Sequence, residues 1–186
     1  MELSNAKSAT DVHAPAIRTL GWEAGLAVEL DVLGARLVVC ATLVGEEIER
    51  RTAEQLGPVA DPWLFRCHAD LDQGFLSRPS PVEILGALVS RKGWTSAREA
   101  VCTFTAFGPR VAVLPPKACR PAVLTEALVT GIGIVRWDGF SAALLAAPGP
   151  SPVGHRTHVH RLVEETVWDA LQRKEDRVAT PHALSF

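Results

Sequence analysis

The stretch that decides the fold is Ser90–Gly149, with the sequence SRKGWTSAREAVCTFTAFGPRVAVLPPKACRPAVLTEALVTGIGIVRWDGFSAALLAAPG. Two prolines end a short apolar run, and Gly131 follows a helix-forming run at the position that favours a helix C-terminus. The spacing of the apolar residues between these breaks predicts the helix Thr95–Phe107, the strand Arg110–Leu114, the helix Arg120–Thr130, and the strands Ile132–Trp137 and Phe140–Ala147. This order predicts an α/β fold with a mixed central sheet flanked by helices, and with Val111, Val113, Ile132 and Ile134 buried.

Other segments extend this pattern in both directions. Leu26–Val32 and Ala35–Leu43 are apolar runs separated by two residues, which predicts an antiparallel hairpin. Ser96 and Glu99 form an S-x-x-E pattern, which predicts a capping box at the start of the first helix of the deciding stretch. The remaining expected elements are a surface helix over Glu46–Leu56 anchored by Ile48 and Leu56, a strand or short helix over Val82–Ser90, and a final helix over Val159–Arg173.

Residues 57–81 are the hardest segment to interpret. Four prolines interrupt it, so we expect a long loop in which Trp63–Phe65 forms a strand-like core anchor. Loops of this length in compact domains usually serve a function. We expect one globular domain over residues 16–174, with flexible tails at residues 1–15 and 175–186.

Composition excludes several classes of protein. The 186 residues carry a net charge of −2 with a pI near 6.3, which argues against a nonspecific DNA coat. The four cysteines form no C-x-x-C pair, so a zinc ribbon is not expected, and Cys40 and Cys102 are predicted as core residues. No export signal or membrane-length apolar run is evident, so we expect a cytoplasmic protein without a membrane partner. The lack of Tyr and the abundance of Ala, Val, Leu, Arg and Gly are typical of a GC-rich bacterial genome.

Leu85–Gly139 resembles the later part of a restriction-endonuclease-like domain of the PD-(D/E)XK superfamily. The segments that carry this resemblance are Ile84–Ser90, Thr95–Phe107, Arg110–Leu114, Pro121–Thr130 and the run Gly131-Ile132-Gly133-Ile134-Val135. The resemblance implies a strand whose carboxylate and lysine share one face and, with a divalent metal, activate water against a phosphodiester. Gly86 and Leu88 stand at the positions where the family has Glu and Lys, so this catalytic pair is missing.

The first functional hypothesis is therefore a non-catalytic binding or assembly protein on a degenerate nuclease-like fold, without a cofactor. The alternative is a magnesium-dependent nuclease with a displaced site made of Asp70, Asp72, Glu83 and Lys92. A third hypothesis is an unfamiliar enzyme whose pocket lies under residues 57–81.

The start of the final helix carries the other candidate residues. His155, His158 and His160 have spacing that could share a metal, although a solvated basic helix start explains them as well. Contacts to phosphate or to an acidic partner are expected from Arg156, His158, His160 and Arg161, which makes nucleic acid a candidate partner. Trp168, next to Leu171, is expected to complete an interface with a protein partner or a second copy of the chain.

Two further patterns favour structural explanations. Cys67 and His68 are adjacent, so they are a poor catalytic dyad with each other. Gly131-Ile-Gly133 follows a helix rather than a strand, which favours helix termination over a dinucleotide fingerprint.

Overall fold

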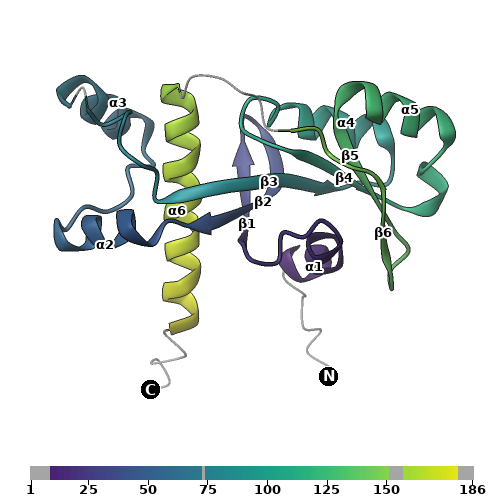
Figure 1. Cartoon of the computed structure of the whole chain (residues 1–186), viewed down its shortest axis with the longest axis horizontal. Helices are drawn as coiled ribbons and strands as arrows, with labels where there is room; N and C mark the ends of the chain where they lie inside the picture. The colour runs from purple at the N-terminus through teal and green to yellow at the C-terminus, as the bar shows by residue number, and fades with distance from the viewer. Residues whose placement is uncertain (1–8, 73, 151–156, 180–186) are drawn as a thin grey trace, which may run out of the picture. The chain divides into compact units, whose positions relative to one another are not determined.

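A computed structural model gives the structure of residues 9–72, 74–150 and 157–179 (Figure 1). Six strands form one sheet in the order β1-β2-β3-β4-β5-β6. The elements are α1 (Ala9–Thr19), β1 (Leu26–Val32), β2 (Ala35–Leu43), α2 (Gly45–Ala53), α3 (Pro62–Leu71), β3 (Val82–Ser90), α4 (Trp94–Cys102), β4 (Arg110–Leu114), the 3-10 helix η1 (Pro116–Ala118), α5 (Pro121–Thr130), β5 (Ile132–Trp137), β6 (Ala142–Ala146) and α6 (His158–Ala179). The predicted α/β fold with a mixed sheet flanked by helices is confirmed.

The chain divides into two compact units. The first unit comprises Met1–Cys40 and Leu85–Val153, and the second comprises Ala41–Ile84 and Gly154–Phe186. The boundary passes through β2 and β3, because each of these strands contributes residues to both units. The expected single domain over residues 16–174 stays a prediction.

The first unit contains the deciding stretch. β3 pairs in parallel with β4 and β4 with β5, whereas β5 and β6 are antiparallel. α4 lies against β4 and α5 against β5 (Figure 1). The four residues predicted to be buried are all at most 2% exposed, which confirms the predicted strands. Burial also raises the pKa of the Cys40 thiol to about 12, as expected for a core cysteine. Cys102, predicted in the core, is exposed.

Several predicted helix boundaries are wrong. α1 begins at Ala9, inside the stretch expected to be a flexible tail. α4 ends at Cys102, and its N-cap is Gly93, so Ser96 lies inside the first turn and donates its hydroxyl to the Gly93 carbonyl instead of forming a capping box. The expected strand-like anchor in residues 57–81 is helix α3. The Asp61 carboxylate caps α3 by accepting hydrogen bonds from the amides of Trp63 and Leu64.

The second unit contains α2, α3 and α6, with α2 and α3 beside α6 (Figure 1). The buried residues of α2 are Glu47 and Arg51, not the predicted anchors Ile48 and Leu56. α6 buries Val163, Val167 and Leu171 as its apolar pattern predicts, but Val159 is half exposed. The same helix buries three charged residues, which are Arg161, Glu164 and Glu165. The second unit is therefore built around charges as well as apolar contacts.

Candidate binding pocket

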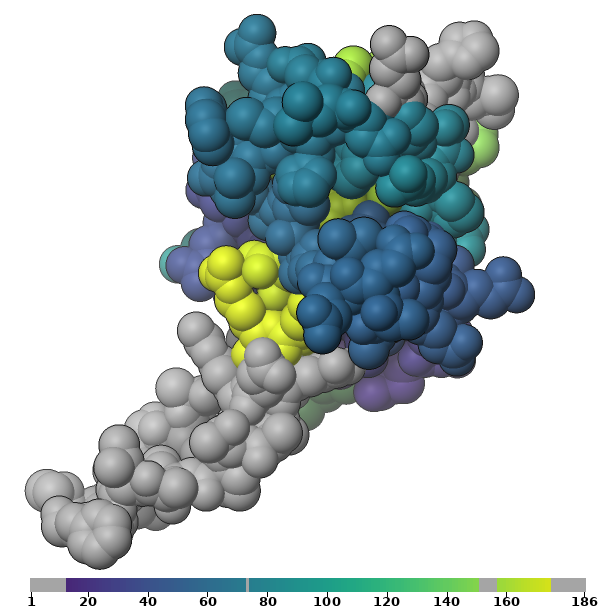
Figure 2. All heavy atoms as spheres, turned by 90° about the vertical axis from the view of Figure 1, so that its left-hand side faces the viewer, coloured from purple at the N-terminus to yellow at the C-terminus, as the bar shows by residue number. Residues whose placement is uncertain are grey.

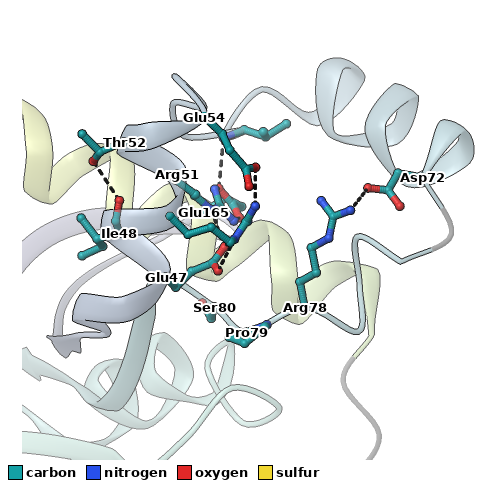
Figure 3. A network of polar contacts seen from close by, with 12 residues as sticks. Glu47, Ile48, Arg51, Thr52, Glu54, Asp72, Arg78, Pro79, Ser80 and Glu165 are labelled. Carbon is teal, nitrogen blue, oxygen red and sulfur yellow. Dashed lines mark hydrogen bonds and ion pairs between the residues drawn. The ribbon is translucent and has the colours of Figure 1, made fainter.

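Glu165 lies at the centre of a buried network of charges in the second unit. Its side chain is fully buried and receives two hydrogen bonds from Arg51, from Nη1 at 2.9 Å and from Nη2 at 2.6 Å. The backbone amide of Val59 donates to the same carboxylate at 3.1 Å. Nε of Arg161 lies 3.1 Å from Oε1 of Glu165. One carboxylate thus connects α2, the segment after it and α6 (Figure 3).

Glu47 completes the network on α2. Nε of Arg51 donates to it at 2.8 Å, and Arg50 donates to it through Nε at 2.9 Å and Nη2 at 2.8 Å. The hydrogen bonds from Arg50, joined by those from Arg51, hold the pKa of the Glu47 carboxyl at about 2, against the opposing effect of burial. Burial alone would lower the pKa of Arg51, but its hydrogen bonds to Glu165 and Glu47 raise it. Glu47 and Arg51 are therefore charged at neutral pH.

Two arginines of the network also lie over aromatic rings. Cζ of Arg51 is 4.7 Å from the ring centre of Trp168, and Cζ of Arg161 is 5.1 Å from that of Phe75. Nη1 of Arg161 also donates to the carbonyl of Pro79 at 2.8 Å. Stacking on aromatic rings, together with hydrogen bonds, suits a planar guanidinium in a buried site. They fix both side chains in place.

A pocket of about 360 Å³ lies against this network. Figure 2 shows the hollow between the α2 and α3 segments, with atoms of α6 at its base. Its apolar lining comes from Leu56, Pro58, Val59, Leu64 and Phe75, and its polar lining from Arg50, Arg51, Gln55, His68, Asp72, Arg78 and Arg161. The pocket therefore combines an apolar lining with four arginines.

The arginines of the pocket differ in accessibility. Arg51 and Arg161 are buried, whereas the side chains of Arg50 and Arg78 are 34% and 44% exposed. Arg78 pairs with Asp72 at 2.9 Å (Figure 3). Arg50 also pairs with Glu54. Exposed pairs of this kind contribute only about 0–1 kcal/mol each. An incoming anion can therefore replace Asp72 or Glu54 at small cost.

The structure does not bring the four nuclease candidates together as ligands. Asp70 is exposed on α3, where it lies 3.9 Å from Arg66, and Asp72 is occupied by Arg78 and by the amide of Gly74. Glu83 is exposed near the start of β3, and Lys92 follows the end of that strand. The strand from Glu83 to Ser90 is about 23 Å long at ~3.3 Å per residue, which prevents Glu83 and Lys92 from sharing one metal ion.

Gly86 and Leu88, at the positions in β3 where the resembled family has Glu and Lys, are both packed tightly against other residues of the first unit. A Cβ on Gly86 would lie 2.4 Å from Cη2 of Trp22 and 2.8 Å from the carbonyl oxygen of Pro109. Leu88 is fully buried in the core cluster of the first unit. No room for a carboxylate exists at Gly86, because the indole of Trp22 occupies it.

The candidate residues at the start of α6 differ in their burial and contacts. His155 and Arg156 lie outside the described residues, so the predicted histidine metal site stays a prediction. His158 is exposed and makes an edge contact with Phe65, and Nδ1 of His160 lies 2.7 Å from the Thr157 hydroxyl. Arg161, expected at a solvated helix start, is instead fully buried.

Trp168, expected on an interface, is 3% exposed, and the guanidinium of Arg51 lies over its ring. The ring therefore packs in the core and is not an exposed anchor. In residues 9–72, 74–150 and 157–179, no three His, Cys, Asp or Glu side chains are grouped to hold a metal ion.

Comparisons of the chain with models of known protein families, with curated proteins and with solved structures find no match. The site must therefore be interpreted from its own chemistry. In the part of the chain that the structure describes, no helix has both the length and the apolar character that crossing a membrane requires.

The sequence interpretation missed the residues that matter most in this pocket. Arg50 and Arg51 fall in the segment predicted as a surface helix, and charges at helical spacing normally face water. Glu165 carries no signal of its own in the final helix. One signal in the sequence indicates the buried charges. The only large apolar residue of α2 is Ile48, which is too little to anchor the helix, and Glu47 and Arg51 lie one turn apart on it. Residues between Gly57 and Arg78 provide much of the lining of this pocket, and the hypothesis of an enzyme with a pocket under residues 57–81 stays a prediction.

Proposed function

We propose that this chain is a non-catalytic binding protein, and that the pocket of the second unit receives an apolar side chain next to a carboxylate on a protein partner. The observation that carries the proposal is the composition of the pocket. Its apolar lining lies beside two accessible guanidinium groups, on Arg50 and Arg78. Arg78 pairs with the partly exposed Asp72, and Arg50 pairs with the exposed Glu54 while the buried Glu47 holds it in place. Guanidinium groups bind carboxylates in a fixed, bidentate geometry.

The surface of α3 supports a protein partner over a small molecule. Leu71 is 88% exposed and lies on the same helical face as Leu64 and His68, which line the pocket. Trp63, on the first turn, is 70% exposed. Apolar surface that continues beyond a pocket is typical of protein interaction sites, where aromatic residues are enriched.

The restriction-endonuclease-like core belongs to the same proposal. The order β3-α4-β4-α5-β5, with β3, β4 and β5 parallel, fits the segments on which the resemblance rests. The packing of Trp22 against Gly86 supports a degenerate, non-catalytic member, because no catalytic carboxylate fits there. We therefore expect no cleavage of DNA or RNA with magnesium or manganese. Metal-dependent cleavage that disappears in Glu83→Ala would instead favour the displaced nuclease site.

The binding proposal is tested with two matched dipeptides, acetyl-Phe-Glu-amide and acetyl-Phe-Gln-amide. Titrations followed by amide NMR shifts should show saturable changes around Leu64 and Phe75 with the Glu peptide. The Gln peptide should bind about tenfold more weakly, because it lacks a charge-assisted hydrogen bond. Equal affinity of the two peptides, or shifts that avoid the pocket, would contradict the proposal.

A further inference from the structure

A second pocket, of about 390 Å³, lies in the first unit at the ends of two parallel strands. It is lined by Lys92, Gly93, Trp94, Lys117, Ala118, Arg120 and Val123. β3 ends at Ser90 and β4 at Leu114, so the lining comes from the loops and helices that follow both strands. The crevice outside the carboxyl ends of parallel strands is where open α/β sheets bind their ligands.

The charge of this pocket is uncompensated. Its lining has three cations, Lys92, Lys117 and Arg120, and no carboxylate. All three side chains belong to exposed residues, and none forms an ion pair with the residues that the structure describes. The arginine pocket of the second unit differs in this respect, because each of its four arginines has a carboxylate partner.

One acidic group approaches the pocket from α5, and it is already engaged. The Glu126 carboxylate accepts a hydrogen bond from Nε1 of Trp94 at 2.7 Å and is paired with Arg98. The hydrogen bond from Trp94, followed by that from Arg98, lowers the pKa of Glu126. Glu126 therefore positions the indole that lines the pocket, while its charge is balanced by Arg98.

The N-terminal ends of α4 and α5 contribute residues to the lining of this pocket. The N-cap of α4 is Gly93, which has no side chain to accept hydrogen bonds, and the amides of Trp94, Thr95 and Ser96 have no acceptor among the described residues. The N-cap of α5 is Arg120, again without a capping side chain. Free amides and the positive end of the helix dipole attract anions, which adds to the attraction of the three cations.

We propose that this pocket binds the dianionic phosphate group of a small phosphate monoester. Three uncompensated cations and the free amides of α4 favour a dianion with several acceptor oxygens over a monoanionic phosphodiester. The chain as a whole carries a charge of −2, which argues against a long nucleic acid as the ligand. The site lies in the other unit from the arginine pocket, and it stands or falls independently of the function proposed above.

The test is a titration of the full chain with inorganic phosphate, phenyl phosphate and dimethyl phosphate, followed by amide NMR shifts. Saturable shifts at Trp94, Thr95 and Ser96 are expected with the first two, and binding of dimethyl phosphate should be at least about tenfold weaker. Phenyl phosphate should bind more tightly than inorganic phosphate if an ester is the natural ligand. Equal affinity would restrict the site to free phosphate and overturn the monoester assignment.

Variants separate binding from folding. Lys117→Gln should weaken phenyl phosphate binding about tenfold, the value of one charge-assisted hydrogen bond. Gly93→Asp should abolish binding without loss of stability, because Asp is a favoured N-cap and a Cβ at Gly93 meets no atom within 4 Å. Arg136→Gln, which removes an exposed cation of β5 outside the pocket, is the control and should bind as the wild type does.

Three outcomes would overturn the proposal. The first is the absence of saturable shifts at the start of α4 at low salt. The second is equal weakening by Arg136→Gln and Lys117→Gln, which would indicate a nonspecific charge effect. The third is tighter binding of a single-stranded oligonucleotide than of phenyl phosphate, which would assign the pocket to nucleic acid.

Discussion

Replacing Glu165 by Gln should destabilise the protein more than any other single conservative substitution of a carboxylate in the second unit. The change keeps the shape of the side chain but removes a buried charge that is 3.1 Å or less from two guanidinium groups and one backbone amide. Glu47 then remains to balance Arg51. Breaking a buried ion pair by removing one partner costs about 3–5 kcal/mol. At ~2–4 °C per kcal/mol for a chain of this size, the melting temperature should fall by roughly 6–20 °C.

The assay is urea unfolding followed by circular dichroism, with Asp169→Asn as the matched control on the same helix. Asp169 pairs with the exposed Arg173 at 2.8 Å, and the loss of such a pair should cost less than about 0.5 kcal/mol. The double variant Arg51→Gln/Glu165→Gln should lose at least about 1 kcal/mol less than the sum of the two single variants, because the two residues interact directly. A Glu165→Gln variant within about 1 kcal/mol of the wild type would refute the central role of this carboxylate.

Three further outcomes are expected. Gly86→Ala should destabilise the first unit by about 1–3 kcal/mol, because its Cβ would overlap the Trp22 ring. Gly45→Ala, whose Cβ would meet no atom within 4 Å, should be neutral. Equal effects of the two variants in thermal unfolding would exclude the overlap with Trp22 as the cause. The pKa of Glu47 in the folded protein is about 2, below its ordinary value of 4.5, so its contribution to stability is present above pH 4.5 and lost as the pH falls towards 2. The free energy of unfolding should drop by about 3 kcal/mol over this window. Glu47→Gln should flatten this dependence of stability on pH. Trp168→Ala should cost about 3–5 kcal/mol in denaturant unfolding without changing the solution mass, since the ring is buried under Arg51; a folded variant with a lower oligomeric mass would restore the interface hypothesis.

The sequence predicted the first unit better than the second for a physical reason. Strand β4 and helix α5 are delimited by local signals, the two prolines after Leu114 and the left-handed Gly131, whose φ is 66°. These signals need no knowledge of distant contacts. Helix α3 was mistaken for a strand-like anchor because Trp63, Leu64 and Phe65 resemble a strand in composition, although Asp61 with a following proline is a helix N-terminus.

The candidate site could not be predicted in the same way. Arg51 and Glu165 are 114 residues apart. Each stands among charged neighbours whose pattern is typical of a solvated helix face. Only their meeting in the fold turns them into a buried pair. Arg161 illustrates the same limit, because its burial depends on carbonyl groups of Arg78 and Pro79 in a distant segment. The basic pocket of the first unit was predicted only in part. Lys92 was a nuclease candidate, whereas Lys117 and Arg120 after β4 were not among the candidate residues.

The proposed function depends on Arg50 and Arg78 making the pocket of the second unit selective for an apolar group beside a carboxylate. The most direct measurement is the affinity of acetyl-Phe-Glu-amide for the double variant Arg50→Gln/Arg78→Gln, compared with Arg66→Gln. Arg66 is an exposed arginine of α3 that does not line the pocket. We expect the double variant, folded as judged by circular dichroism, to bind at least about tenfold more weakly, and Arg66→Gln to bind as the wild type does. Unchanged affinity in the double variant, or an equal loss in Arg66→Gln, would contradict the proposed function.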